Sequence, residues 1–145
     1  MSKTVFVLNG PNLNLLGTRE PEIYGTDTLD IIAGRLEDRG RELGLTIDMR
    51  QSNHEGHLCD WLHEAQAQAA LAVLLNAGAL THTSLTLHDA IRSIRTPVIE
   101  VHLSNPHARE EFRHRSLVGM AARGTIAGFG ALGYELALEA AARLR

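Results

Sequence analysis

Short apolar runs alternate along the chain with longer segments in which apolar residues recur at helical spacing. The apolar runs predict five buried strands, at residues 4–8, 45–49, 71–75, 97–102 and 125–127. The helical segments lie at residues 28–43, 58–69, 84–94, 108–115 and 131–144. Asp27 or Thr28, and Ser84, stand at the expected starts of two helices, where a side-chain oxygen can accept a hydrogen bond from a first-turn N–H group.

This alternation indicates the α/β class, because helices that connect parallel strands cover the faces of the sheet. Five such units suit a flavodoxin-like, doubly wound five-stranded parallel sheet, in which ligands bind beyond the carboxyl ends of the strands. A chain of 145 residues with 44% hydrophobic content can build one ordinary core. We therefore expect a single domain over residues 1–145.

Charge and cysteine content narrow the class of function. The net charge is −3 and no basic run occurs, which argues against nucleic-acid and membrane-surface partners and favours a small ligand. The only cysteine, Cys59, excludes an internal disulfide and fits a reducing compartment. The first apolar run is too short for a secretory signal, and no stretch approaches the length of a membrane span. We expect a cytoplasmic protein.

The segment between the first strand and the first helix is unusually long and reads GPNLNLLGTREPEIYG, residues 10–25. Connections are usually about four to six residues long, and longer ones are more often lids or binding segments. Glycine and proline residues suit a hinged lid that carries Asn12, Arg19 and Tyr24. Arg19 is a permanent cation, so its proximity would favour phenolate over phenol and make Tyr24 a usable base. A solvated surface loop with a tyrosine packed for its ring explains the same residues at this stage.

Polar residues also follow the third and fourth strands. Asn76 and His82 follow the third strand, and Glu100, His102 and Ser104 lie at the end of the fourth. Glu100 and His102 are two residues apart, so their side chains leave the same face of a strand and the carboxylate can hold the imidazole in one tautomer. Each residue singly also fits a helix cap or a hydrogen-bonded strand end, but their convergence on one rim favours a site.

Motifs for other chemistries are incomplete. The glycine pattern GxGxxG at residues 128–133 leaves only twelve residues after it, too few for a dinucleotide-binding unit. His54 and His57 are three residues apart in HEGH, which is not a zinc motif, and no cysteine cluster supports them. Lys3 is the only lysine and precedes the first strand, which argues against Schiff-base catalysis. We expect neither a metal nor a cofactor.

Four segments carry a family resemblance: GPNLNLLGTREPEIYG at residues 10–25, QSNHEG at 51–56, NAGALTHTS at 76–84 and IEVHLSNPHAREEFRHRS at 99–116. In this order, and over nearly the whole chain, they resemble the type II 3-dehydroquinate dehydratases. The resemblance implies a lyase that converts 3-dehydroquinate to 3-dehydroshikimate in the shikimate pathway, by anti elimination through an enolate. It also implies no Schiff base, metal or organic cofactor, and a homo-oligomer built from trimers, commonly a dodecamer.

The resemblance implies roles for individual residues. Tyr24 corresponds to the base that removes a proton alpha to the ketone, Arg19 to its activator, and Asn12 to a residue that supports the enolate through an ordered water. His102 corresponds to the acid that protonates the departing hydroxyl, and Glu100 to its partner. The substrate-binding positions correspond to Asn76, His82, Asp89, Arg113 and the backbones of Leu103 and Ser104. Arg109 lies beside the rim. The resemblance further suggests that Asp89 reaches the site of a neighbouring subunit.

Three positions depart from the family pattern, and two other protein classes share the expected fold. Leu80, His88 and Pro106 replace a frequent aromatic residue, a frequent arginine and a small aliphatic residue, and none of the three removes a catalytic match. The changes at Leu80 and His88 concern subunit contacts more than chemistry. A receiver module needs acidic residues after the first strand and an aspartate after the third, where this chain has Asn9 and Asn76. A flavin-binding carrier needs a phosphate loop and stacking aromatic residues, yet aromatic residues make up only 4%. The sequence leaves open whether the pathway is aromatic biosynthesis or quinate breakdown.

Overall fold

Five parallel strands form one sheet in the computed structural model, which describes residues 3–144. The strands are β1 (Lys3–Asn9), β2 (Leu45–Gln51), β3 (Ala72–Asn76), β4 (Val98–His102) and β5 (Gly124–Ala127). Their spatial order is β2-β1-β3-β4-β5, which confirms the flavodoxin-like doubly wound arrangement. Each predicted strand is present, and its ends lie within two residues of the predicted ones.

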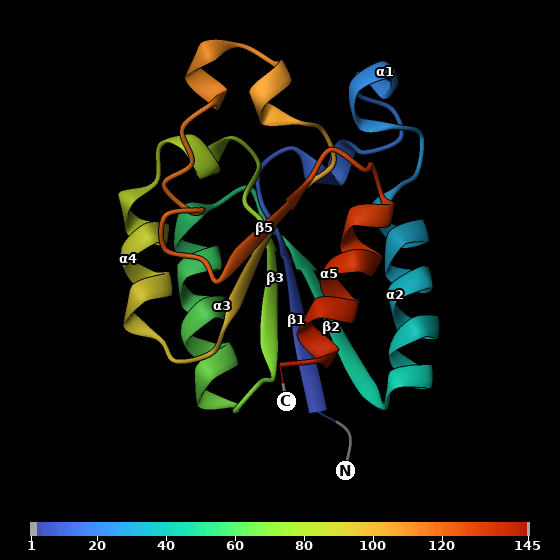
Figure 1. Ribbon diagram of the computed structural model, residues 1–145, viewed down its shortest axis with the longest axis vertical. Helices are drawn as coiled ribbons and strands as arrows, with labels where there is room; N and C mark the ends of the chain where they lie inside the picture. The colour runs from blue at the N-terminus through green and yellow to red at the C-terminus, as the bar shows by residue number, and fades with distance from the viewer. Residues whose placement is uncertain (1–2, 145) are drawn as a thin grey trace.

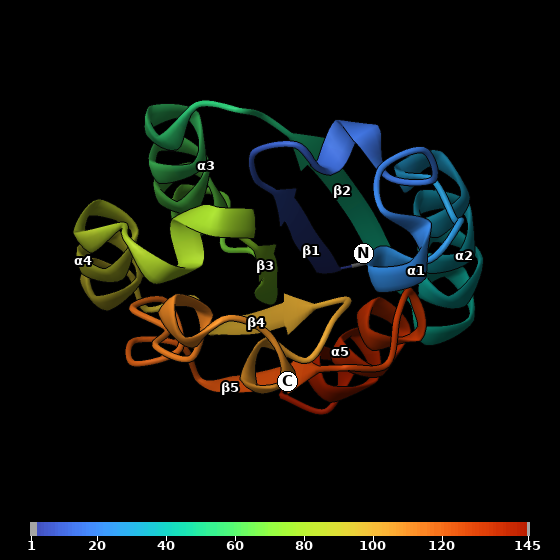
Figure 2. The same ribbon diagram turned by 90° about the horizontal axis from the view of Figure 1, so that it is seen from above.

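Two helices cover each face of the sheet (Figures 1 and 2). Helices α2 (Leu29–Leu43) and α5 (Leu132–Ala142) pack on one face, and α3 (Glu55–Ala67) and α4 (Leu85–Ser93) on the other. Alternate residues of β1 point to opposite faces: Val5 joins the core under α2 and α5, and Phe6 the core under α3 and α4. Burial of both faces explains why β1, β3 and β4 are mostly apolar along their length. No helix within residues 3–144 is long and apolar enough to cross a membrane.

Helix starts follow the predicted capping chemistry in two cases and depart from the prediction in a third. The side-chain oxygen of Thr28 accepts a hydrogen bond from the N–H of Ile31 at 3.2 Å, and that of Ser84 from the N–H of Leu87 at 2.9 Å. Helix α3, in contrast, begins at Glu55 and not near residue 58. The prediction was wrong because Gly56, which suggested a loop, lies in the first turn of the helix.

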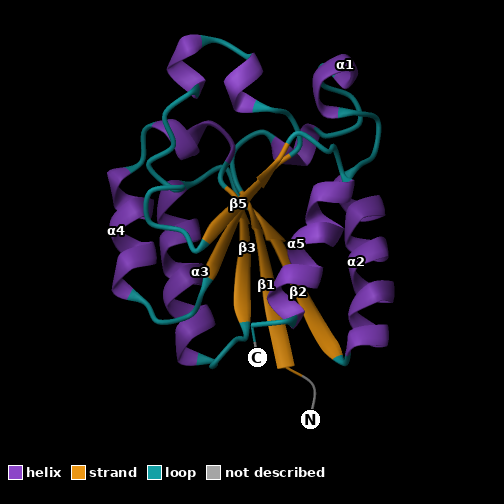
Figure 3. Cartoon of the chain, in the orientation of Figure 1, coloured by secondary structure: helices purple, strands orange, loops and turns teal. Residues whose placement is uncertain are grey.

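The polar helix predicted at residues 108–115 is absent, and two 3₁₀ turns take its place, η3 (Pro106–Ala108) and η4 (Glu111–Arg113). Arg109 has an extended backbone, with φ −111° and ψ −163°, and this interrupts any continuous helix. The long segment after β1 also contains short elements, the 3₁₀ turn η1 (Leu13–Leu15) and the four-residue helix α1 (Pro21–Tyr24). A further 3₁₀ turn, η2 (Gly78–His82), follows β3. Figure 3 shows these short elements beyond the carboxyl ends of the strands, where the fold places a ligand.

Candidate active site

A cavity lies at the carboxyl edge of the sheet, between the segment after β1 and the turns after β4. Its empty volume is about 580 Å³, a figure that includes space open to solvent. Its lining consists of Pro11, Asn12, Leu13, Arg19, Tyr24, Asn76, Gly78, Ala79, His82, His102, Leu103, Ser104, Pro106, Arg109 and Arg113. These residues follow three neighbouring strands, β1, β3 and β4, as the rule for doubly wound sheets requires.

The floor of the cavity depends on a close approach of two backbones. The N–H of Gly10, just after β1, donates a hydrogen bond of 2.8 Å to the carbonyl of Asn76 at the end of β3. A Cβ atom on Gly10 would lie 2.5 Å from the carbonyl oxygen of Ala77, so a larger residue would force the two segments apart. Asn12 follows in the left-handed conformation, with φ 71°, and its N–H donates to the Asn53 side chain at 3.0 Å. The base of the segment after β1 is therefore held in place.

The outer part of the same segment is attached more weakly. The backbone N–H groups of residues 18–25 that form hydrogen bonds in the described structure donate to carbonyls of the same segment, and Gly17 and Gly25 at its ends have φ values of 94° and 85°. The Tyr24 ring has the guanidinium carbon of Arg19, from the same segment, at 4.9 Å from its centroid, and across the cavity it has that of Arg109 at 5.1 Å. A segment fixed at its base and held across the cavity through one ring has the construction of a lid.

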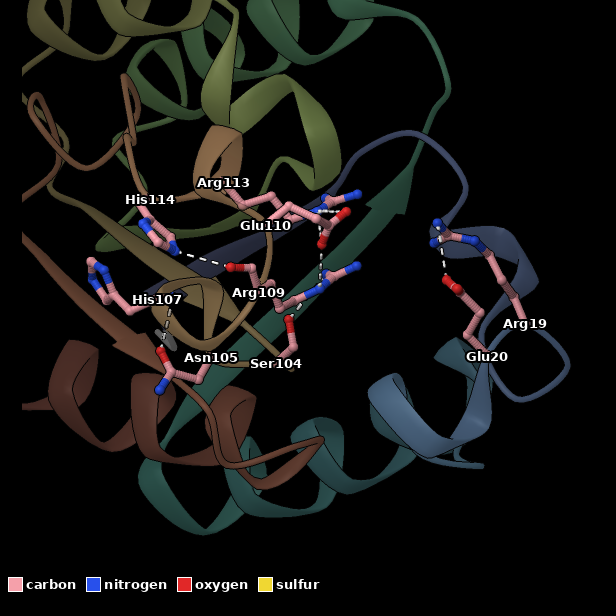
Figure 4. Close-up of polar contacts among 9 residues, drawn as sticks. All are labelled: Arg19, Glu20, Ser104, Asn105, His107, Arg109, Glu110, Arg113 and His114. Carbon is pink, nitrogen blue, oxygen red and sulfur yellow. Dashed lines mark hydrogen bonds and ion pairs between the residues drawn. The ribbon is translucent and has the colours of Figure 1, made fainter.

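Guanidinium groups give the cavity a surplus of positive charge (Figure 4). Arg19 forms an ion pair with Glu20 at 3.5 Å, while Arg109 and Arg113 both pair with Glu110, at 3.7 and 3.2 Å. A hydrogen bond to its own backbone N–H and the attraction of the two arginines hold the pKa of Glu110 below its usual range. Three cations against two carboxylates favour an anionic ligand.

Glu100 and His102 form a buried pair on β4. The Nε2 atom of His102 lies 2.7 Å from Oε2 of Glu100, whose side chain is only 2% exposed. Burial raises the pKa of Glu100, but hydrogen bonds from His102, Ser116 and Thr125 outweigh this effect and lower it below its ordinary value. An ionised carboxylate only accepts hydrogen bonds, so Nε2 of His102 donates and Nδ1 remains available to a ligand.

Asn76 is held by a buried hydrogen-bond chain that reaches helix α5. Its Nδ2 donates to the hydroxyl of Tyr134 at 2.9 Å, and this hydroxyl donates to Oδ1 of Asn9 at 2.7 Å. The Oδ1 of Asn76 accepts from the N–H of Gly78 at 3.2 Å. These contacts fix the orientation of the Asn76 amide at the edge of the cavity.

Nine of the eleven residues predicted for the site line the cavity: Asn12, Arg19, Tyr24, Asn76, His82, His102, Leu103, Ser104 and Arg113. Glu100 does not line it and lies behind His102. Asp89 lies on α4 and is absent from the lining. The structure thus brings the predicted residues together, while the role of each stays a prediction.

Sequence reasoning missed four residues that act on the site through contacts. Arg109 was expected only beside the rim, yet it lies over the Tyr24 ring. Ser116 and Thr125 both donate to Glu100, and Tyr134 anchors Asn76. Thr125 could have been found only from the pairing of β4 with β5, in which it stands opposite Glu100.

Comparisons with known proteins agree over almost the full length of the chain. The family model described as dehydroquinase class II matches residues 3–142. A 3-dehydroquinate dehydratase of Rhizobium johnstonii is 61% identical over 140 residues, which is 97% of this chain and 96% of that protein. One from Mesorhizobium japonicum is 63% identical over 144 residues, covering 98% of this chain and 99% of that protein.

Solved structures give the same result. The type II dehydroquinase from Propionibacterium acnes superposes with a TM-score of 0.94 at 50% identity, covering 99% of this chain and 98% of that one. The type II dehydroquinase from Butyrivibrio crossotus also gives a TM-score of 0.94, at 37% identity and 97% coverage of both chains. These similarities favour an enzyme over the receiver module and the flavin carrier that share the fold. The chain belongs to the class II dehydroquinase family of enzymes.

Proposed function

We propose that the protein is a 3-dehydroquinate dehydratase, which eliminates water from 3-dehydroquinate to give 3-dehydroshikimate. The observation that carries the proposal is the convergence on one cavity of Tyr24, two guanidinium groups and the Glu100–His102 pair. A dehydration of this kind needs a base for the C–H proton and an acid for the hydroxyl group, and the cavity offers one candidate for each. The relatives at 61% and 63% identity bear this name.

Tyr24 acts as the base in the first half of the reaction. Its phenolate accepts the proton alpha to the ketone, and the electron pair of the broken C–H bond forms the enolate. The guanidinium carbons of Arg19 and Arg109 lie 4.9 and 5.1 Å from the ring centroid, so two positive charges lie beside the base. Asn12, on the cavity wall, supports the enolate oxygen through an ordered water.

His102 acts as the acid in the second half. The enolate electron pair forms the new carbon–carbon double bond, the ketone is restored, and the C–O bond to the hydroxyl breaks. The departing oxygen takes a proton from Nδ1 of His102 and leaves as water, an overall anti elimination. Glu100, 2.7 Å from Nε2, stabilises the imidazolium before this step and keeps the ring in one orientation.

Substrate binding draws on the remaining polar groups. The substrate carries a carboxylate and several hydroxyl groups, which suit the surplus positive charge of the cavity and its mixed donors. We assign its binding to Asn76, His82, Arg113 and the backbones of Leu103 and Ser104. Asp89 does not line the cavity of its own chain, so we assign it to the site of a neighbouring subunit in a homo-oligomer, a trimer-based dodecamer. The whole chain, residues 1–145, acts as one catalytic domain in the cytoplasm.

The reaction proceeds without a Schiff base. Lys3 is the only lysine, and it begins β1 at the end of the sheet opposite the cavity. The seven residues of β1 separate the two ends by about 20 Å, at about 3.3 Å per residue. A substrate carbonyl in the cavity therefore has no lysine amine within reach.

Turnover of 3-dehydroquinate tests the proposal, followed by the ultraviolet absorbance of the conjugated enone product. The purified protein should convert the substrate, and Tyr24→Phe should retain binding but lose nearly all of kcat, because only the phenolic oxygen accepts the proton. Binding of the substrate to Tyr24→Phe is measured by titration calorimetry. Wild-type protein without turnover would refute the assigned activity, and a fully active Tyr24→Phe would remove Tyr24 from the mechanism.

A further inference from the structure

The carboxylate of Glu100 receives hydrogen bonds from three side chains on different segments. Oε2 accepts from Nε2 of His102 at 2.7 Å and from the hydroxyl of Ser116 at 2.5 Å. Oε1 accepts from the hydroxyl of Thr125 at 2.6 Å. Because both oxygens are bonded, rotation of the carboxylate about its last side-chain bond would break contacts.

The direction of the Ser116 hydroxyl is fixed by its second contact. The N–H of Gly119 donates to the Ser116 oxygen at 2.7 Å, so the hydroxyl hydrogen is free to point at Glu100. Space here is tight, since a Cβ atom on Gly119 would lie 2.7 Å from Oε1 of Glu100 and 2.9 Å from the Ser116 oxygen. The next residue, Leu117, is anchored by a 2.9 Å hydrogen bond to the carbonyl of Thr81. Ser116 thus belongs to an anchored turn.

Thr125 reaches Glu100 through strand pairing. The two residues stand opposite each other in the β4–β5 register, which places their side chains on the same face of the sheet. Thr125 is exposed at the edge strand, whereas Glu100 is buried, so the Thr125 hydroxyl covers the solvent side of the carboxylate.

We propose that Ser116 and Thr125 are positioning residues for the acid half of the reaction: their hydroxyl groups hold Glu100 ionised and in the orientation that fixes the His102 ring. Neither hydroxyl lines the main cavity; both line a small second cavity together with Glu100 and His102, and we assign them to Glu100 and not to the substrate. The inference rests on the proposed function, because it assigns His102 the role of acid. Two neutral donors stabilise the buried carboxylate without the net charge that an arginine or lysine would add beside His102.

Other ionisable groups near the pair come from three further segments. His82, His107, Arg113 and His114 line a small second cavity together with Glu100 and His102. His82 and His114 use one ring nitrogen each on backbone carbonyls, of Arg115 and Arg109, at 2.8 and 3.0 Å. These groups are the same in wild type and in the variants, so the test depends on differences between matched proteins.

The test compares the isosteric variant Thr125→Val, the variant Ser116→Ala and the double variant with wild type. The double variant should lose about tenfold to a hundredfold in kcat, the range typical of groups that orient a functional histidine, with KM changed less than about twofold. The acid limb of its kcat–pH profile should move to higher pH, because a carboxylate without these donors is protonated at higher pH. Thr125→Ser keeps the hydroxyl, so this single variant should have the kcat and the kcat–pH profile of wild type.

Thr81→Val is the matched control. Within the part of the chain that the structure describes, the buried Thr81 hydroxyl has no hydrogen-bond partner, so its loss removes a nearby hydroxyl without touching Glu100. Equal losses in Thr81→Val and the double variant would overturn the proposal, as would a Thr125→Ser variant as impaired as Thr125→Val. A double variant with wild-type kcat and an unshifted profile would do the same.

Nitrogen NMR of the histidine side chains gives a readout that does not depend on turnover. In wild type the neutral His102 ring should carry its proton on Nε2, with its signals assigned by their absence in His102→Gln. The double variant should show a mixture of tautomers, and an unchanged tautomer would overturn the proposal. Lack of turnover by wild type would instead contradict the assigned reaction, so the two failures are distinguishable.

Discussion

Replacing Tyr134 with phenylalanine removes one hydroxyl group that joins three elements of the core. The Tyr134 side chain is fully buried, and burial raises its pKa, so the hydroxyl stays protonated and donates. It donates to Oδ1 of Asn9 on β1 at 2.7 Å and accepts from Nδ2 of Asn76 on β3 at 2.9 Å. Phenylalanine keeps the ring and its packing, so the change isolates these two hydrogen bonds.

The expected cost follows from the two groups that lose a partner. A buried donor or acceptor left unsatisfied costs about 1–3 kcal/mol, so the Asn9 acceptor and the Asn76 donor together cost about 2–6 kcal/mol of the free energy of unfolding. The entropy of unfolding is about 2.1 cal/mol/K per residue, or about 0.3 kcal/mol/K for 145 residues. The thermal midpoint of Tyr134→Phe should therefore fall by about 7–20 °C.

Calorimetry or circular dichroism at one fixed protein concentration measures the midpoint, because subunit association also stabilises folded chains. Tyr24→Phe makes the same chemical change at the other tyrosine. Among residues 3–144 no hydrogen bond to the Tyr24 hydroxyl is present, so its midpoint should change by less than about 2 °C. If the thermal midpoint of Tyr134→Phe lies within about 2 °C of that of wild type, these two hydrogen bonds do not stabilise the fold as reasoned. A loosened Asn76 amide should also raise KM.

Three further predictions concern the mechanism and the assembly. Borohydride should not inactivate the enzyme in the presence of substrate, because Lys3 lies at the far end of β1, and mass spectrometry of a reduced covalent adduct would contradict this. Limited proteolysis should cut residues 18–25 quickly in the free enzyme and slowly with a saturating substrate analogue; equal rates would refute the lid. Oligomers reassembled from inactive Tyr24→Phe and weakened Asp89→Asn subunits should exceed the mean activity of their parents, since some interfaces pair intact residues of two chains. Subunit exchange is verified by mass tags, and activity no higher than that mean would place Asp89 in its own chain's site.

Local patterns were sufficient for most of the fold. Strands buried on both faces read as continuous apolar runs, and the caps at Thr28 and Ser84 depend on a side chain and an N–H three residues later. The short elements around the cavity were missed or misread, because three or four residues are too few to show a period. The extended backbone of Arg109, which divides the predicted polar helix, has no signature in residue pattern.

The residues of the candidate site also fall into those that the sequence pattern reveals and those that it does not. Residues at strand ends, such as Asn76 and His102, were found because the topology of a doubly wound sheet places them on one rim. Thr125 and Tyr134 were not found, since their contacts with Glu100 and Asn9 span 25 and 125 residues of sequence. Such contacts depend on strand register and helix docking, which no local pattern encodes.

The separation between Asn9 and Tyr134 also bears on the order of folding. β1 is an interior strand of the sheet and precedes the other strands along the chain, yet one of its faces is covered in part by α5, which follows β5. A nascent chain must therefore keep apolar residues of β1 exposed until α5 has been synthesised and has docked. Contacts of such high sequence separation slow folding and prolong the exposure of unpaired strand edges. Chains shortened before α5 should accumulate as aggregates, so catalytic competence and escape from aggregation both depend on the docking of α5.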